Sequence, residues 1–190
     1  DFELTTNTNG EENMYFQLPA WRPGRYELAN FAENIQKWDA FDENNNPIDF
    51  QKVKKDLWEV HTQGTKEITI IYSFYANELD AGRCYLDENQ LYLNPVNCMF
   101  YIQGRMDEKY EVELKIPNNY IIASSLEKKG KQLYAKGYDL LAESPIICSN
   151  TLQHESYQVN NITFHLWFQG ECEIDWKKLK KDFIAFTKSQ

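Results

Sequence analysis

Histidine is scarce in this 190-residue sequence, which has three: His61, His154 and His165. They stand far apart, and no His-Glu-x-x-His or Cys-x-x-Cys pair occurs. A catalytic zinc ion needs three protein ligands, which sequences usually supply as such closely spaced residues. We therefore expect no metal site within these residues, and we interpret His165 as an exposed or hydrogen-bonded histidine on the polar face of a strand.

Glycine is also scarce, with eight residues, and the sequence lacks Gly-x-Ser-x-Gly, a phosphate loop and a Gly-rich dinucleotide turn. Asp80, Asp87 and Glu88 cluster before a predicted strand. Paired carboxylates that act as acid and base need apolar surroundings to separate their pKa values, and this loop is polar. We interpret them as solvated loop acids. On its residues alone, the chain has no catalytic site.

Basic residues are too few to balance the acidic ones: 20 Lys and Arg stand against 29 Asp and Glu, with a net charge of −9. An acidic surface repels phosphate backbones, so we expect no nucleic-acid partner. Long apolar runs are missing too, and we expect no membrane span. Two lysine runs, at 128–131 and 177–181, are interpreted as a solvated hairpin tip and a solvated helix face.

The start of the chain does not predict a compartment, because the sequence opens at Asp1 without an initiator Met or a signal peptide. The four cysteines are Cys84, Cys98, Cys148 and Cys172. Two disulfides in any of three pairings are possible, and free buried thiols are equally compatible with this number.

Aromatic residues are abundant, at 15% of the chain, and they favour β-sheet surfaces. Apolar and polar residues alternate over 110–116 and 162–168, as in half-buried strands. Residues 66–76 are apolar on both faces, which predicts a central strand covered on both sides. Shorter strand-like runs occur at 12–18, 35–41, 47–53, 56–61, 91–93, 97–103, 120–125 and 132–136.

Turn formers separate these runs, for example at 43–47, 63–64, 129–130 and 160–161. Many short strands with regular turns predict an all-β fold, an antiparallel β-sandwich of about nine or ten strands. We place this domain at residues 1–172.

One amphipathic helix is predicted near the C-terminus. Asp175 is a suitable N-cap, and apolar residues follow at helical spacing with lysines opposite: Trp176, Leu179, Phe183, Ile184 and Phe186. The helix runs to Gln190 without a Gly or Asn stop signal. We expect residues 173–190 to be a connector helix leading into a segment that is absent from the chain.

The segment from Trp21 to Tyr26, here called the Trp21–Tyr26 corner, is the most distinctive stretch; it comprises Trp21, Arg22, Pro23, Gly24, Arg25 and Tyr26. Pro23-Gly24 fits the central positions of a type II turn, because Pro restricts φ and Gly accepts a positive φ. The indole of Trp21 is then held in one place. It serves either as a cap on the core or as a preorganised contact for a partner, with Arg22 and Arg25 supplying charge.

The corner belongs to a longer stretch, LPAWRPGRYELANFAENI at 18–35, which resembles the L-P-x-W-x-P-G-x-Y…F-A-x-N signature of glycyl-aminopeptidase-type zinc metallopeptidases. The similarity continues with Trp58 in a W-x-V strand and with YSFYA at 72–76. Residues 138–145 and the terminal IDWKKLKKDF also resemble the family. Two positions depart from its pattern: Arg25 replaces the usual Ser, and Glu143 replaces the usual Asp.

This resemblance implies a non-catalytic, all-β N-terminal domain of a larger enzyme. In the family, a thermolysin-like catalytic domain with a His-Glu-x-x-His zinc site and a PDZ domain follow. The partners implied are the catalytic domain of the same chain and the peptide substrate of the parent enzyme. The cofactor implied is zinc, held by the parent enzyme, with no counterpart ligands in residues 1–190.

Two functions remain open at this point. The first is an accessory domain that packs on a catalytic domain of a zinc aminopeptidase and helps shape its substrate cleft. The second is a free-standing β-sandwich module that binds carbohydrate or peptide on an aromatic face.

Overall fold

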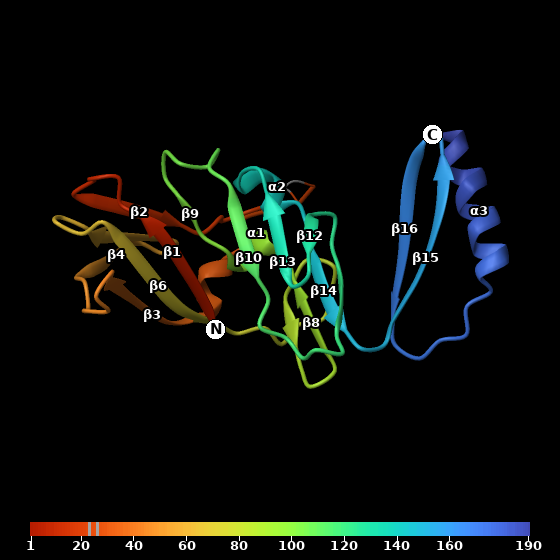
Figure 1. The fold of residues 1–190 in the computed structure, drawn as a ribbon, viewed down its shortest axis with the longest axis horizontal. Coiled ribbons are helices and arrows are strands. Elements are labelled where there is room, and N and C mark those ends of the chain that lie inside the picture. Colours follow the sequence, from red (N-terminus) through yellow and green to blue (C-terminus); the bar gives the residue numbers. More distant parts are fainter. Residues whose placement is uncertain (23, 26) are drawn as a thin grey trace.

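The computed structural model describes residues 1–22, 24–25 and 27–190, and its strands form five antiparallel sheets (Figure 1). Four sheets pack in pairs within one large body, and the fifth lies apart beside the C-terminal helix. The predicted all-β, sandwich-like class is confirmed.

The first sandwich packs the sheet β1-β6-β3 against the sheet β4-β5-β2-β9. The strands are β1 (Phe2–Asn7), β2 (Asn13–Gln17), β3 (Ile35–Asp42), β4 (Phe50–Lys54), β5 (Leu57–His61), β6 (Glu67–Phe74) and β9 (Tyr101–Ile102). Alternate residues of each inner strand point into the core, as the period of two requires. Three of them from β6 are fully buried: Ile68, Ile70 and Tyr72.

Aromatic rings fill this first core. Trp58 and Trp38 stack with ring centroids 5.9 Å apart, and Phe100 meets Trp58 edge to face at 5.0 Å. Phe100 also meets Tyr72 edge to face at 4.9 Å. Such offset and edge contacts add to the stabilisation that comes from burying the rings, so these residues hold the two sheets together.

The second sandwich packs the sheet β11-β14-β8-β7 against the sheet β10-β13-β12. Its elements are β7 (Tyr85–Leu86), β8 (Gln90–Leu93), α1 (Pro95–Cys98), β10 (Tyr110–Glu113), β11 (Ile121–Ala123), β12 (Glu127–Lys129), β13 (Gln132–Ala135), α2 (Tyr138–Ala142) and β14 (Ile146–Ser149). Tyr72 joins the two cores, because its hydroxyl donates to the carbonyl of Cys98 at 2.7 Å.

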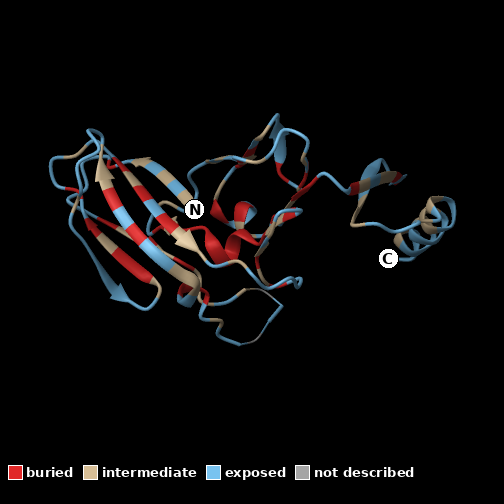
Figure 2. Cartoon of the chain, turned by 90° about the horizontal axis from the view of Figure 1, so that it is seen from below, coloured by how far each residue is buried: buried red, intermediate tan, exposed pale blue. Residues whose placement is uncertain are grey.

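The C-terminal unit consists of β15 (Leu152–Val159), β16 (Ile162–Gln169) and α3 (Trp176–Ser189). The two strands form a hairpin, and α3 packs chiefly on β15. As predicted, Asp175 caps the helix: its side chain accepts a hydrogen bond from the backbone N–H of Lys178 at 3.0 Å. Buried residues are concentrated in the large body, and few occur in this unit (Figure 2).

Three expectations about individual elements differ from the structure. The described residues contain sixteen strands rather than nine or ten, because several paired segments are only two or three residues long. Residues 95–98 are helical where a strand was predicted from 97, since Pro95 starts a helical turn. Residues 67–74 do form a central strand, but Ile71 is 39% exposed, so only one face is covered.

Candidate functional site

The 19–30 loop, which contains the Trp21–Tyr26 corner, leaves β2 and returns to the core at the 3-10 helix η1 (Phe31–Asn34). Leu18 and Phe31, at its two ends, are buried in the first core. The backbone N–H of Ala29 donates to the carbonyl of Ala20 at 2.7 Å and closes the base of the loop. A loop with anchored, adjacent ends presents its middle residues in a restricted arrangement.

The turn within this loop agrees with the prediction as far as the structure describes it. Gly24 has φ +82°, as the third residue of a type II turn requires, and the N–H of Arg25 approaches the carbonyl of Arg22 at 3.4 Å. Pro23 and Tyr26, which were also predicted to belong to the site, lie outside the described residues.

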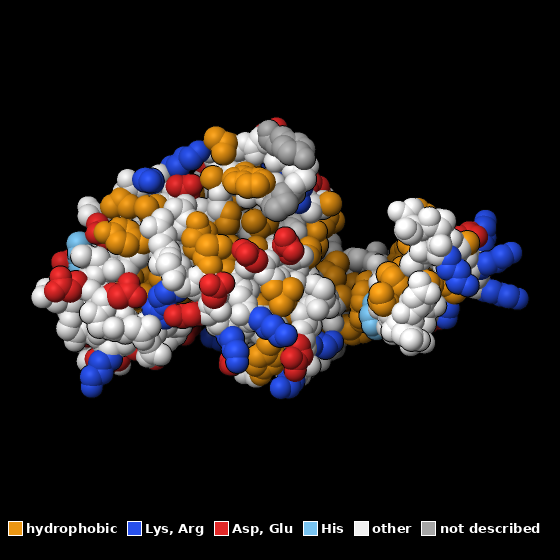
Figure 3. Space-filling view, turned by 90° about the horizontal axis from the view of Figure 1, so that it is seen from above, with side chains coloured by type: hydrophobic (Ala, Val, Ile, Leu, Met, Phe, Trp, Pro, Cys, Tyr) orange, Lys and Arg blue, Asp and Glu red, His pale blue; other side chains and the backbone are white. Residues whose placement is uncertain are grey.

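Trp21 is 55% exposed and Leu28, in the same loop, is 72% exposed. Of the two readings that the sequence left open for Trp21, this exposure argues against a cap on the core. The body shows hydrophobic side chains interspersed with charged ones when viewed from above, whereas lysines gather at the far end of the C-terminal unit (Figure 3).

Arg22 fastens the loop to a second loop, at residues 77–83. Its guanidinium Nη1 donates to the carbonyl of Ala81 at 3.3 Å, and the same guanidinium lies directly on Gly82. A Cβ at Gly82 would overlap the Nη2 atom of Arg22, so only glycine permits this approach. The sequence predicted charge at Arg22 but gave no indication of this contact.

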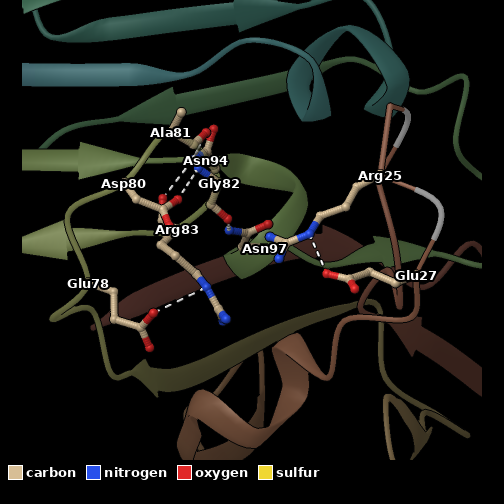
Figure 4. A network of polar contacts seen from close by, with 9 residues as sticks. All are labelled: Arg25, Glu27, Glu78, Asp80, Ala81, Gly82, Arg83, Asn94 and Asn97. Carbon is tan, nitrogen blue, oxygen red and sulfur yellow. Dashed lines mark hydrogen bonds and ion pairs between the residues drawn. The ribbon is translucent and has the colours of Figure 1, made fainter.

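A network of polar contacts holds the 77–83 loop in place (Figure 4). The buried amide of Asn94 donates to the carbonyl of Arg83 at 2.6 Å, and that of Asn97 donates to Gly82 at 2.7 Å. Arg83 forms an ion pair with Glu78 at 3.2 Å. Both asparagines were missed by the sequence analysis, because their role depends on a loop more than ten residues away.

Arg25, in the 19–30 loop, extends towards the polar network of the 77–83 loop (Figure 4). Its Nε donates to the carboxylate of Glu27 at 2.5 Å, and its guanidinium points towards Asn97 (Figure 4). The Oδ1 atom of Asn97 is buried without a hydrogen-bond partner among the described residues. The two loops thus carry three arginines, of which Arg25 and Arg83 are paired with Glu27 and Glu78 and Arg22 binds the carbonyl of Ala81.

Two thiols lie beneath this network. Asn94 accepts hydrogen bonds from the thiols of Cys84 and Cys98 through its carbonyl, at 3.7 and 3.4 Å. A hydrogen bond from Cys98 holds the pKa of Cys84 below its usual range, whereas burial raises the pKa of Cys98. All four cysteines are free, and three of them are buried.

Two of the loop acids, Asp80 and Asp87, accept hydrogen bonds from backbone N–H groups. Asp80 accepts a hydrogen bond from the N–H of Gly82 at 2.5 Å, and Asp87 accepts from those of Asn89 and Gln90 at 2.8 Å. These backbone bonds lower the pKa of the Asp87 carboxyl. Such contacts stabilise the ionised form and are typical of turns.

Histidines do not assemble into a metal centre in the part of the chain that the structure describes. His165 is exposed, as predicted, and its Nδ1 lies 2.9 Å from Nε2 of His154. No group of three or more potential ligands occurs among the described residues, whereas a catalytic zinc requires three. These residues therefore do not fit a zinc site. In the same residues, no helix is long and apolar enough to cross a bilayer.

Comparison with known proteins decides the family. The family description "Peptidase M61 N-terminal domain" matches residues 1–150, which include the corner and both sandwiches. The chain belongs to this family. Several residues of its motifs support the core: Trp58 is buried, and the hydroxyls of Tyr72 and Tyr138 donate to the carbonyls of Cys98 and Met99.

A solved structure has the same fold as this peptidase N-terminal domain and the unit that follows it. The crystal structure of an aminopeptidase N family protein from Idiomarina loihiensis matches 98% of the chain with a TM-score of 0.90 and 22% identity. The match covers 33% of that protein, so the chain spans about a third of its length. No curated protein matched the sequence.

The contact between Arg22 and Gly82 makes a testable prediction. Gly82→Ala should expel the Arg22 guanidinium and loosen the 19–30 loop, while changing global stability by less than about 1 kcal/mol, as is usual at the surface. A loss of about 1 kcal/mol in local stability should make trypsin cleave after Arg25 about fivefold faster.

The control is a double-mutant cycle with Arg22→Ala. If Gly82→Ala acts by displacing Arg22, the double variant should be cleaved no faster than Arg22→Ala alone. Additive acceleration would show that the alanine disturbs the 77–83 loop by another route.

Proposed function

We propose that this peptidase N-terminal domain is an accessory domain, which docks on the catalytic domain of the same polypeptide and helps shape its substrate cleft. The observation that carries the proposal is an exposed, anchored tryptophan in the signature motif of a peptidase family. Leu18, Phe31 and Ala32 of that motif pack in the core, but packing does not explain an indole that is 55% exposed.

The 19–30 loop has the properties of a docking element. Its ends are buried, its base is closed by a backbone hydrogen bond, and Arg22 ties its middle to the 77–83 loop. A preorganised loop loses little conformational entropy when it binds. A rigid tryptophan beside arginines is also the composition found at the energetic centres of protein interfaces.

In this proposal, the zinc site and the main peptide-binding site lie in the parent enzyme outside residues 1–190. The described residues hold no ligand trio, so the domain would contribute surface rather than a metal ligand. Arg22, which is bound to a backbone carbonyl and has no acidic partner among the described contacts, would place positive charge at the edge of the cleft, where it attracts carboxylate groups of a peptide.

The proposal is tested by comparing residues 1–190 with the longer polypeptide encoded by the same gene. We expect the longer polypeptide to retain about one zinc after dialysis and to hydrolyse glycyl peptides in a chelator-sensitive manner. Residues 1–190 should do neither. A longer polypeptide with no peptidase activity, or a gene that ends near residue 190, would instead favour a free-standing carbohydrate- or peptide-binding module.

A further inference from the structure

The C-terminal hairpin and helix are poorly buried for a folded unit. Among residues 152–190, all of which the structure describes, Leu152, Tyr157 and Val159 alone are buried, and α3 has no buried residue. The helix contacts the hairpin through exposed or half-buried side chains. Phe168 meets Trp176 edge to face at 5.5 Å, the hydroxyls of Tyr157 and Thr187 lie 2.9 Å apart, and Lys180 pairs with Glu155 at 3.4 Å. A two-stranded hairpin needs a further strand or a packed helix for independent stability, and α3 supplies this packing without burying any residue of its own.

The outer edge of β16 is the part of this unit that lacks the usual protection. Exposed edge strands normally carry charges or proline, which prevent pairing with other chains. Among the described edge strands of four or more residues, all but β16 carry charges: Glu3 in β1, Lys37 and Asp39 in β3, Lys52 and Lys54 in β4, Glu111 and Glu113 in β10, and Glu155 in β15. The eight residues of β16, ITFHLWFQ, include neither a charge nor a proline.

The hairpin shares no backbone ladder with the sheets of the large body among the described residues. In Figure 1, β16 lies on the side of β15 away from α3, so the helix leaves its outer edge open. The open face of the hairpin carries a stack of His165, His154 and Trp167, with centroids of His154 and Trp167 4.0 Å apart. Both an edge and a face of the hairpin are therefore free to receive a partner.

We propose that the outer edge of β16 pairs with a further strand, supplied by the same polypeptide outside residues 1–190. The strands β15 and β16 and the helix α3 would then belong to the sheet of the next domain, which places the domain boundary near Asn150 rather than at residue 172. The proposal rests on the proposed function, because it requires a longer polypeptide.

Two observations favour this occupant over an unrelated partner. The family match ends at residue 150, two residues before β15 begins. The similar crystal structure matches 98% of this chain, a share that must include most of the hairpin and helix, within a protein about three times as long. An uncharged strand of eight residues that is regular along its full length also suits pairing in the interior of a sheet.

Hydrogen exchange tests the proposal directly. In an antiparallel hairpin, alternate N–H groups of β16 bond to β15 and the remaining ones point outward. In residues 1–190, the outward amides of β16 should exchange rapidly. In the longer polypeptide from the same gene, they should be protected at least about 100-fold, as expected for ladder hydrogen bonds. The edge strand β4, with Lys52 and Lys54, is the internal control, and its outward amides should exchange rapidly in both.

Three outcomes would overturn the proposal: rapid exchange of these amides in both polypeptides, equal protection in both, or protection of residues 1–190 that rises with concentration. The third would identify a second copy of the chain as the occupant. Peptide hydrolysis is measured on the same longer polypeptide. Protected amides in β16 without peptide hydrolysis would support the edge pairing and contradict the proposed function. Peptide hydrolysis without protected amides would support the proposed function and contradict the edge pairing.

Discussion

Replacing Trp21 with alanine should barely change the stability of residues 1–190. In the longer polypeptide, the same substitution should markedly lower the peptidase activity or the stability of the contact between the domains. The indole is 55% exposed, and surface substitutions usually change the free energy of unfolding by less than about 1 kcal/mol. At an interface, the loss of a central tryptophan typically costs 2 kcal/mol or more. We therefore expect kcat/KM for glycyl peptides to fall at least about tenfold, or the domains to separate at lower urea concentration.

Trp58→Ala is the matched control for this experiment. Trp58 is 3% exposed, stacks on Trp38 and contacts Phe100, so its truncation should cost residues 1–190 about 3–5 kcal/mol. Urea unfolding of both variants, in the short and the long polypeptide, separates the two roles. If Trp21→Ala destabilises residues 1–190 as much as Trp58→Ala does, or leaves the longer polypeptide unaffected, Trp21 has no docking role.

The free energy of unfolding should fall steeply in alkaline solution, because several tyrosines are buried in their neutral form. Burial raises the pKa of Tyr110 to about 12, and it raises the pKa of Tyr72 and Tyr138 well above their usual range. In the unfolded chain these hydroxyls ionise near pH 10. Above that pH the unfolded state binds fewer protons than the folded state, so the free energy of unfolding decreases as pH rises.

The sign and size of this effect follow from proton linkage. The stabilisation is complete below about pH 10 and is lost as the pH rises towards 12. Each fully buried tyrosine contributes a slope of up to about 1.4 kcal/mol per pH unit, and the partly buried Tyr110 contributes less. Urea unfolding at several pH values, with absorbance near 295 nm to follow ionisation, measures the slope.

Tyr138→Phe isolates one of these groups. It should lower stability at pH 8 by about 1 kcal/mol, because the hydrogen bond from its hydroxyl to the carbonyl of Met99 is lost. Between pH 10 and 12 it should also reduce the slope by about 1.4 kcal/mol per pH unit. An unchanged slope would mean that Tyr138 ionises equally in the folded and unfolded states.

Local patterns predicted the parts of the fold that depend on neighbours in the sequence. The N-cap at Asp175, the turn at Gly24 and the strand over 162–168 each arise from interactions within a few residues, and all three are present, although Ile162 is exposed rather than inward-facing. Strands without a strong local signal were missed: β1 and β14 acquire their structure from pairing with distant partners. Pairing between distant segments leaves no periodic signal that a single strand could carry.

Local patterns also predicted only part of the candidate site. The sequence identified the Trp21–Tyr26 corner and its two arginines, because Pro-Gly and the family signature are local features. It did not identify Gly82, Asn94 or Asn97, since their roles arise only where the 77–83 loop meets Arg22 and α1. Likewise, Phe31 is an ordinary apolar residue in sequence, and only its burial shows that it anchors the loop.

The sequence by itself determined the all-β class, the family, the capped C-terminal helix and the preorganised turn at the corner. These follow from composition, periodicity and short motifs, which act over a few residues. The tertiary structure decided that the sheets form two sandwiches, that Trp21 faces solvent, and that β15, β16 and α3 lie apart with an unprotected edge. The physical reason is that burial and strand pairing depend on residues far apart in the chain, whose encounter no local pattern encodes.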